Sequence, residues 1–78
     1  MNLRVMTTLT KTFPNGTIST WKFGQLHDGR FAAKSNTGKR IILGTTLPQC
    51  DRAIHNFMFR YGYTKPSATL IRQLALAV

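Results

Sequence analysis

Three short motifs that end in glycine divide the first half of the chain at regular intervals. They are Pro14-Asn15-Gly16, His27-Asp28-Gly29 and Asn36-Thr37-Gly38. Glycine adopts the positive φ that tight hairpin turns require, and the segments between these motifs are rich in β-branched and aromatic residues, which is typical of strands. The spacing therefore predicts an antiparallel meander of three to four strands, over residues 5–13, 17–26, 30–35 and 39–43.

Apolar and polar residues alternate along these predicted strands, as they do in a sheet with one covered face and one open face. In the second strand Trp21 and Phe23 alternate with Lys22. Trp21 is expected in the core, whereas a register shifted by one residue would expose it on the open face as a stacking platform. The side chains predicted to point toward the core are Val5, Leu9, Phe13, Trp21, Phe23, Phe31 and Ala33.

A helix is predicted to cover the sheet. Gly44 ends the last strand, and Pro48 suits the first turn of a helix that runs to about Tyr61 and stops at Gly62. Apolar residues recur within it at helical spacing and form one stripe that we expect to lie on the sheet. The stripe consists of Cys50, Ile54, Phe57, Met58 and Tyr61.

A second, short helix is predicted after Pro66 and Ser67, and it is apolar nearly all round. Such a helix needs to be buried. It either packs under the first helix at the sheet edge or forms a homodimer contact. The chain as a whole is thus expected to be a single α+β domain, residues 1–78, with the element order ββββαα.

The net charge is the next constraint. Eleven Lys and Arg residues face two acids, Asp28 and Asp51, and there is no Glu, for a formal net charge of +9. A compact body with this excess repels itself, so the charge is better explained by a polyanionic partner than by the needs of the fold. Nucleic acid is the expected partner, DNA more than RNA. A membrane partner is not expected, because it would need a basic amphipathic helix and most of these cations lie on predicted strands.

Most cations lie on the predicted strands or beside their turns, and Lys22, Arg30 and Lys34 are expected on the face opposite the core. Long cationic side chains among threonine hydroxyls suit phosphates and base edges, whereas a merely solvated face would ordinarily mix lysine with glutamate. The residues expected to bind nucleic acid are Lys22, Arg30 and Lys34 at the centre, Lys11, Lys39 and Arg40 at the margin, and Arg52 on a flanking phosphate.

Residues suited to catalysis or metal binding are scarce, with two acids, two histidines and one cysteine in the chain. Cys50 and His55 lie on one predicted helix at a spacing that makes their side chains diverge by about 140°, and a closed zinc site needs about four ligands. We therefore expect no enzyme, no metal and no cofactor. Because the cysteine is alone and no segment resembles a signal peptide or a membrane span, we expect a cytoplasmic protein.

Part of the chain carries a pattern found in a known family. The pattern consists of Gly29-Arg30-Phe31-Ala32-Ala33-Lys34, Asn36-Thr37-Gly38-Lys39-Arg40-Ile41-Ile42-Leu43-Gly44-Thr45 and Ala53-Ile54. With it, residues 21–57 resemble the AP2/integrase-type DNA-binding domain. The resemblance implies a three-stranded antiparallel sheet that packs on one amphipathic helix and enters the major groove with its open face. It also implies that Lys22, Arg30, Lys34 and Arg40 reach bases or phosphates.

A second function class is compatible with the same sequence. Small phage proteins that inhibit host defence complexes, such as anti-CRISPR proteins, bind a protein or a nucleoprotein complex. Aromatic and arginine side chains dominate protein interfaces, and the predicted helix has Phe59 on its outer side, where the core does not need it. The interface expected under this alternative consists of His55, Phe59 and Arg60.

Overall fold

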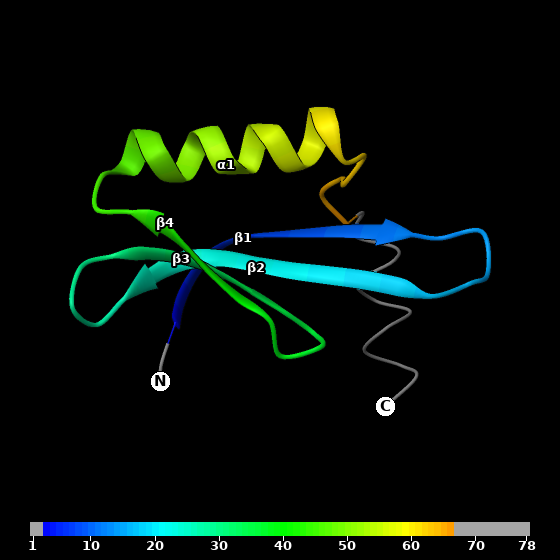
Figure 1. Ribbon diagram of the computed structural model, residues 1–78, viewed down its shortest axis with the longest axis horizontal. Coiled ribbons are helices and arrows are strands. Elements are labelled where there is room, and N and C mark those ends of the chain that lie inside the picture. Colours follow the sequence, from blue (N-terminus) through cyan, green and yellow to red (C-terminus); the bar gives the residue numbers. More distant parts are fainter. Residues whose placement is uncertain (1–2, 67–78) are drawn as a thin grey trace.

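A four-stranded antiparallel sheet and one helix form the part of the chain that the computed structural model describes, residues 3–66. The strands follow the order β1-β2-β3-β4, so each pairs with its neighbour in sequence, and the helix lies over one face of the sheet (Figure 1). The elements are β1 (Leu3–Thr12), β2 (Ile18–Leu26), β3 (Phe31–Ser35), β4 (Arg40–Gly44) and α1 (Leu47–Arg60). The predicted α+β class and meander are confirmed. The second helix predicted after Pro66, with its homodimer contact, lies outside the described residues.

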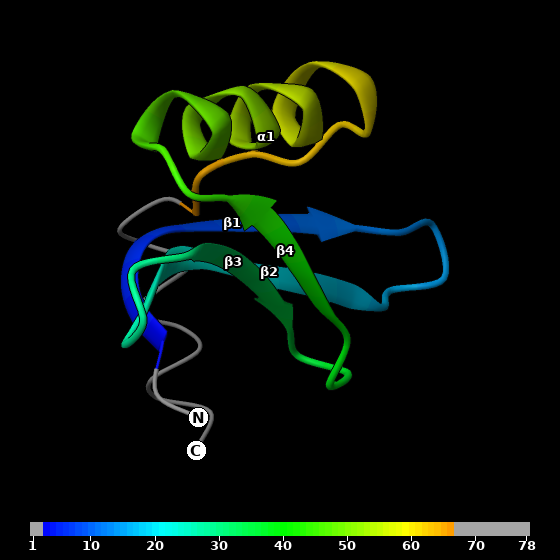
Figure 2. The same cartoon turned by 60° about the vertical axis from the view of Figure 1, so that its left-hand side comes forward.

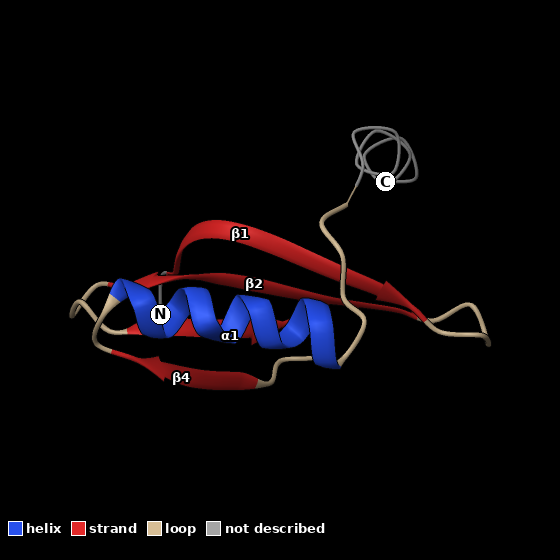
Figure 3. Cartoon of the chain, turned by 90° about the horizontal axis from the view of Figure 1, so that it is seen from above, coloured by secondary structure: helices blue, strands red, loops and turns tan. Residues whose placement is uncertain are grey.

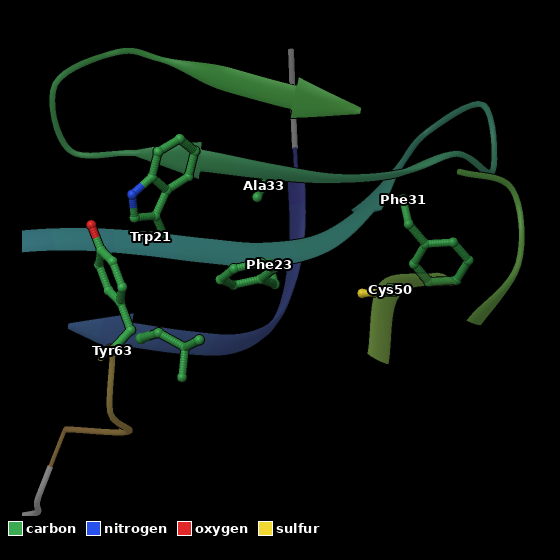
Figure 4. Close-up of a cluster of buried hydrophobic side chains, with 7 residues drawn as sticks. Trp21, Phe23, Phe31, Ala33, Cys50 and Tyr63 are labelled. Carbon is green, nitrogen blue, oxygen red and sulfur yellow. The ribbon is translucent and has the colours of Figure 1, made fainter. Parts of the chain in front are cut away.

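The core lies between the sheet and α1, which runs along the strands over the middle of the sheet (Figure 3). Trp21 and Phe23 pack edge-on against the Phe57 ring of α1, with centroid distances of 5.3 and 5.0 Å. Trp21 is therefore a core residue, as expected, and not a stacking platform. The buried cluster, drawn in Figure 4, consists of Leu9, Trp21, Phe23, Phe31, Ala33, Cys50 and Tyr63.

Three residues predicted in the core are not part of it. Phe13 is half-buried and lies outside the buried cluster. Val5 is 47% exposed, because a β-bulge interrupts the pairing of β1 with β2 between Val5 and Thr7. The bulge makes Thr7 the partner of Phe23 and turns Val5 to the face away from α1. Tyr61 is 55% exposed, since it is the C-cap residue at the end of α1, and its ring and that of Phe57 meet in a T-shaped contact.

Beyond α1 the chain returns to the sheet, which the sequence did not predict. The backbone N–H of Tyr63 donates to the Phe57 carbonyl at 3.0 Å, and the Tyr63 hydroxyl shares a hydrogen bond of 2.8 Å with Ser19 Oγ. Thr64 then forms two backbone hydrogen bonds with Thr10, of 2.8 and 2.9 Å. This bridge occupies part of the outer edge of β1, which would otherwise offer unpaired backbone groups.

The side chain of Gln49, in the first turn of α1, caps the backbone just before the helix. Gln49 Oε1 accepts hydrogen bonds from the backbone N–H groups of Thr45 and Thr46, at 2.9 and 3.1 Å. These are amides that a phosphate at a helix N-terminus would use. The Gln49 side chain also occupies the space in which Gly44 would carry a Cβ, and Gly44 has a φ of 138°.

Gly24 of β2 has no room for a side chain. A Cβ added there would collide with the Arg4 carbonyl at the β1 bulge, and backbone atoms cannot move aside as a flexible side chain can. We predict that Gly24→Ala lowers the free energy of unfolding by about 1–3 kcal/mol. Urea denaturation followed by Trp21 fluorescence measures this, and an unchanged midpoint would contradict the close approach of β1.

Candidate nucleic-acid interface

Three cationic side chains lie side by side on the face of the sheet away from α1. Lys22 of β2 is the Cα partner of Lys34 of β3, and Lys34 is the partner of Arg40 of β4. Lys22 stands between the buried Trp21 and Phe23, so strand alternation directs it to the opposite face. We call Lys22, Lys34 and Arg40 the cationic row. All three are exposed, and neighbouring strands are about 4.8 Å apart, so the row spans roughly 10 Å.

The positive charges of the cationic row repel one another. Like charges directly opposite one another in an antiparallel pair are destabilising, and Lys34 has a cation opposite it on both sides. Neither acidic side chain of the protein belongs to the row, because Asp28 lies in the β2–β3 turn and Asp51 lies on α1. The sheet therefore concentrates positive charge on this face.

The neighbouring cross-strand rows on the same face differ in character. On one side Thr10 of β1 pairs with Thr20 of β2, and Thr8 pairs with Lys22 itself, so hydroxyl groups adjoin the cations. On the other side an apolar row crosses all four strands. The apolar row consists of Val5, Gly24, Ala32 and Ile42, which are successive Cα partners.

A hollow lies on this face beside the cationic and apolar rows. The start of β1 and the β3–β4 turn both bend away from α1, so the face is concave between them (Figure 2). Leu26 and Ala32 are buried, at 6% and 1% exposed, although they lie on the side without the helix. The residues that line the hollow are Leu3, Leu26, Ala32, Lys34, Gly38 and Arg40.

The β3–β4 turn is held in one conformation by polar side chains. Ser35, only 5% exposed, accepts hydrogen bonds through Oγ from the N–H groups of Thr37 and Lys39, at 3.2 and 3.0 Å. Asn36 ties the turn to β2, since its Nδ2 donates to the Ile18 carbonyl at 3.2 Å. Lys39 is thus carried between Lys34 and Arg40 on a turn that these hydrogen bonds brace.

Arg30, predicted at the centre of the interface, lies in the β2–β3 turn and not in the cationic row. Its Nε donates to Asp28 Oδ2 at 2.7 Å, and its backbone N–H donates to Asp28 Oδ1 at 3.1 Å. The backbone hydrogen bond is the main reason that the pKa of the Asp28 carboxyl is lowered, with the guanidinium adding to the effect. Arg40, predicted at the margin, takes the place in the row.

Two other predicted binding residues also lie away from the row. Lys11 shares the side of β1 that carries the buried Leu9, and its ammonium lies over the rings of Phe13 and Tyr63, 5.2 and 6.0 Å from their centroids. Lys11 is therefore engaged on the helix side of the sheet. Arg52 is exposed on α1, across the sheet from the row.

The alternative interface residues are only partly brought together. The rings of His55 and Phe59 lie 5.4 Å apart on α1 with a tilt of 30°, and Phe59 is 77% exposed. Both residues line a groove between α1 and β1. Arg60 is exposed in the last turn of α1 and does not line this groove. The groove is lined by Thr7, Asp51, Ile54, His55, Met58, Phe59 and Lys65. Lys65 had no sequence signal that linked it to this helix.

Groups that could support catalysis are not assembled in residues 3–66. Cys50 is fully buried, and burial, followed by the charge of Asp51, raises the pKa of its thiol. No group of three or more His, Cys, Asp or Glu side chains within this range could hold a metal ion. Among the described residues, no helix has the length and apolar character needed to span a membrane.

Comparisons with known proteins identify no relative. No protein-family model matches the chain, and no curated protein or solved structure of significant similarity was found.

The repulsion within the cationic row has a measurable consequence for stability. Lys34→Gln removes the charge that both Lys22 and Arg40 face, so we predict that it raises the free energy of unfolding by about 0.5–1 kcal/mol at low salt. The gain should shrink as added salt screens the row. Urea denaturation at two ionic strengths measures both effects.

Lys65→Gln is the matched control, because it removes one exposed lysine outside the row. Equal effects of the two substitutions would mean that net charge, and not the cross-strand register, causes the destabilisation.

Proposed function

We propose that this is a small non-enzymatic protein that binds nucleic acid, DNA in preference to RNA, through the open face of its sheet, and that it acts in the cytoplasm. The observation that carries the proposal is the direct cross-strand register of Lys22, Lys34 and Arg40. A row of like charges that weakens the fold is readily explained if phosphates neutralise it in the bound state.

Further features of the same face support this function. Thr8 and Thr20 place hydroxyl groups next to Lys22, and hydroxyl groups commonly donate to phosphate oxygens. Lys39 adds a cation on the β3–β4 turn. The protein has a net charge of +9, which attracts polyanions at long range and speeds their association.

The resemblance to the AP2/integrase-type domain favours DNA as the nucleic acid. In that family the open face of a sheet packed on one helix is the binding surface, and the cationic row occupies the corresponding face here. The strand β1 is an addition to the pattern of the family. We therefore propose that the chain belongs to the AP2/integrase-type family.

Binding to duplex DNA should depend on the cationic row. We predict that replacing Lys22, Lys34 and Arg40 together by Gln weakens binding and makes the slope of log K against log salt shallower by about 3, since each phosphate contact contributes about 0.9. Fluorescence anisotropy of a labelled duplex, titrated at several salt concentrations, measures both quantities.

The matched control is the triple substitution of Arg52, Arg60 and Lys65 by Gln, which removes the same net charge from outside the row. It should leave the slope nearly unchanged. A salt-independent affinity of the unaltered protein, or equal losses in the two triple variants, would contradict the proposal.

One observation favours a second candidate function, a phage-type inhibitor of the anti-CRISPR kind. Phe59 is 77% exposed, and its ring lies near that of His55 beside a groove that Lys65 also lines. An exposed aromatic ring next to a groove and cations is a common anchor of protein interfaces. Under this alternative the partner is a host defence protein or nucleoprotein complex that contacts α1.

Phe59→Ala tests the alternative. If α1 is the interface, the variant should bind a defined protein partner about thirtyfold more weakly than the unaltered protein does, in a pull-down treated with nuclease and followed by mass spectrometry. Tyr61→Ala, which removes an exposed ring outside the groove, is the control. Retention of the same partner by Phe59→Ala would exclude α1 as the interface.

A further inference from the structure

Within residues 3–66, the apolar row beside the cationic row keeps exposed apolar side chains at its two ends. Val5 and Ile42 are 47% and 44% exposed, and the buried Ala32 lies between them at the hollow that Lys34 and Arg40 also line. Apolar side chains next to clustered cations suit a partner that presents apolar groups close to its negative charges.

Aromatic residues do not contribute to this part of the open face. Within the described strands, Trp21, Phe23 and Phe31 belong to the cluster under α1. The cationic and apolar rows therefore contain no ring on which an unpaired base could stack, and stacking is the usual means of holding single strands. A duplex partner fits these rows better than a single strand does.

On duplex DNA the apolar group accessible in the major groove is the 5-methyl group of thymine. The major groove admits a two-stranded β-ribbon. Strands β3 and β4 form the hairpin at one edge of the sheet, with β3 also paired to β2, and their turn bends away from α1 (Figure 2). This hairpin carries Lys34 and Arg40 in one cross-strand pair and Ala32 and Ile42 in the next pair on the same face.

We propose that the β3–β4 hairpin makes the open face favour duplex DNA sites with thymine methyl groups, with Ile42 as the principal contact. This inference rests on the proposed DNA-binding function and adds a preference to it. The cationic row neutralises phosphates whatever the sequence, whereas Ile42 gains contact only where a methyl group is present.

The test compares two duplexes that differ only in methyl groups. The full chain is titrated, by fluorescence anisotropy, with an A·T-rich duplex and with the same duplex carrying deoxyuridine in place of thymidine. We expect the deoxyuridine duplex to bind about fourfold more weakly for each methyl group that is contacted, from the transfer value of one buried carbon. In a G·C duplex, 5-methylcytosine in place of cytosine should restore part of the affinity.

Two isoleucines of β4 provide a matched pair of variants. Ile42 is the partner of Ala32 on the open face, and Ile41 is the partner of Ala33 on the helix side. Their exposed fractions are 44% and 42%. Ile42→Ala should remove most of the difference between the thymidine and deoxyuridine duplexes, while Ile41→Ala should preserve it.

The outcomes separate this inference from the function on which it rests. Equal, salt-dependent binding of the two duplexes by the unaltered protein would overturn the inference and leave the proposed function standing. Absence of salt-dependent binding to either duplex would overturn both. Equal effects of Ile41→Ala and Ile42→Ala would exclude Ile42 as the methyl contact.

Discussion

The packing of Phe57 against Trp21 and Phe23 is the interaction on which the rest of the structure depends. It joins α1 to the central strand β2 through two edge-on ring contacts. Side chains of a strand alternate between the faces of a sheet, so burial of these two rings directs Lys22 to the opposite face. A shift of one residue would bury the lysine and expose both rings, which makes the observed register strongly preferred.

The same packing helps to explain how the sheet tolerates its charged face. An aromatic pair contributes about 0.5–1.5 kcal/mol beyond the burial of its area, and Phe57 packs against the rings of Tyr61 and Tyr63 as well as those of β2. A like-charge pair across two strands opposes folding by about 0.2–1 kcal/mol, and the cationic row contains two such pairs. The aromatic packing of the core can therefore offset the repulsion within the cationic row.

Local patterns in the sequence predict most of the fold and less of the candidate site. Glycine-terminated turns and the spacing of apolar residues predict the four strands and α1, because turn geometry and periodicity are properties of short segments. The β1 bulge has no such pattern, so the face of Val5 was predicted wrongly. The place of Arg40 depends on pairing across the β3–β4 turn, and the bridge from Thr64 to Thr10 joins residues far apart in the chain. The position of Lys11 on the helix side of the sheet, by contrast, could have been predicted, because Lys11 is two residues after Leu9 on the same strand.

The order of the strands also bears on how the protein folds. Each strand pairs with its neighbour in sequence, so the sheet can form by extending hairpins, and only short loops need to be closed. Within the described residues, the backbone bridge joins Thr10 of β1 to Thr64, and strands β2 to β4 and α1 lie between these two residues in sequence. We therefore expect this bridge to form late in folding and to open early in local unfolding, while the central strands stay paired.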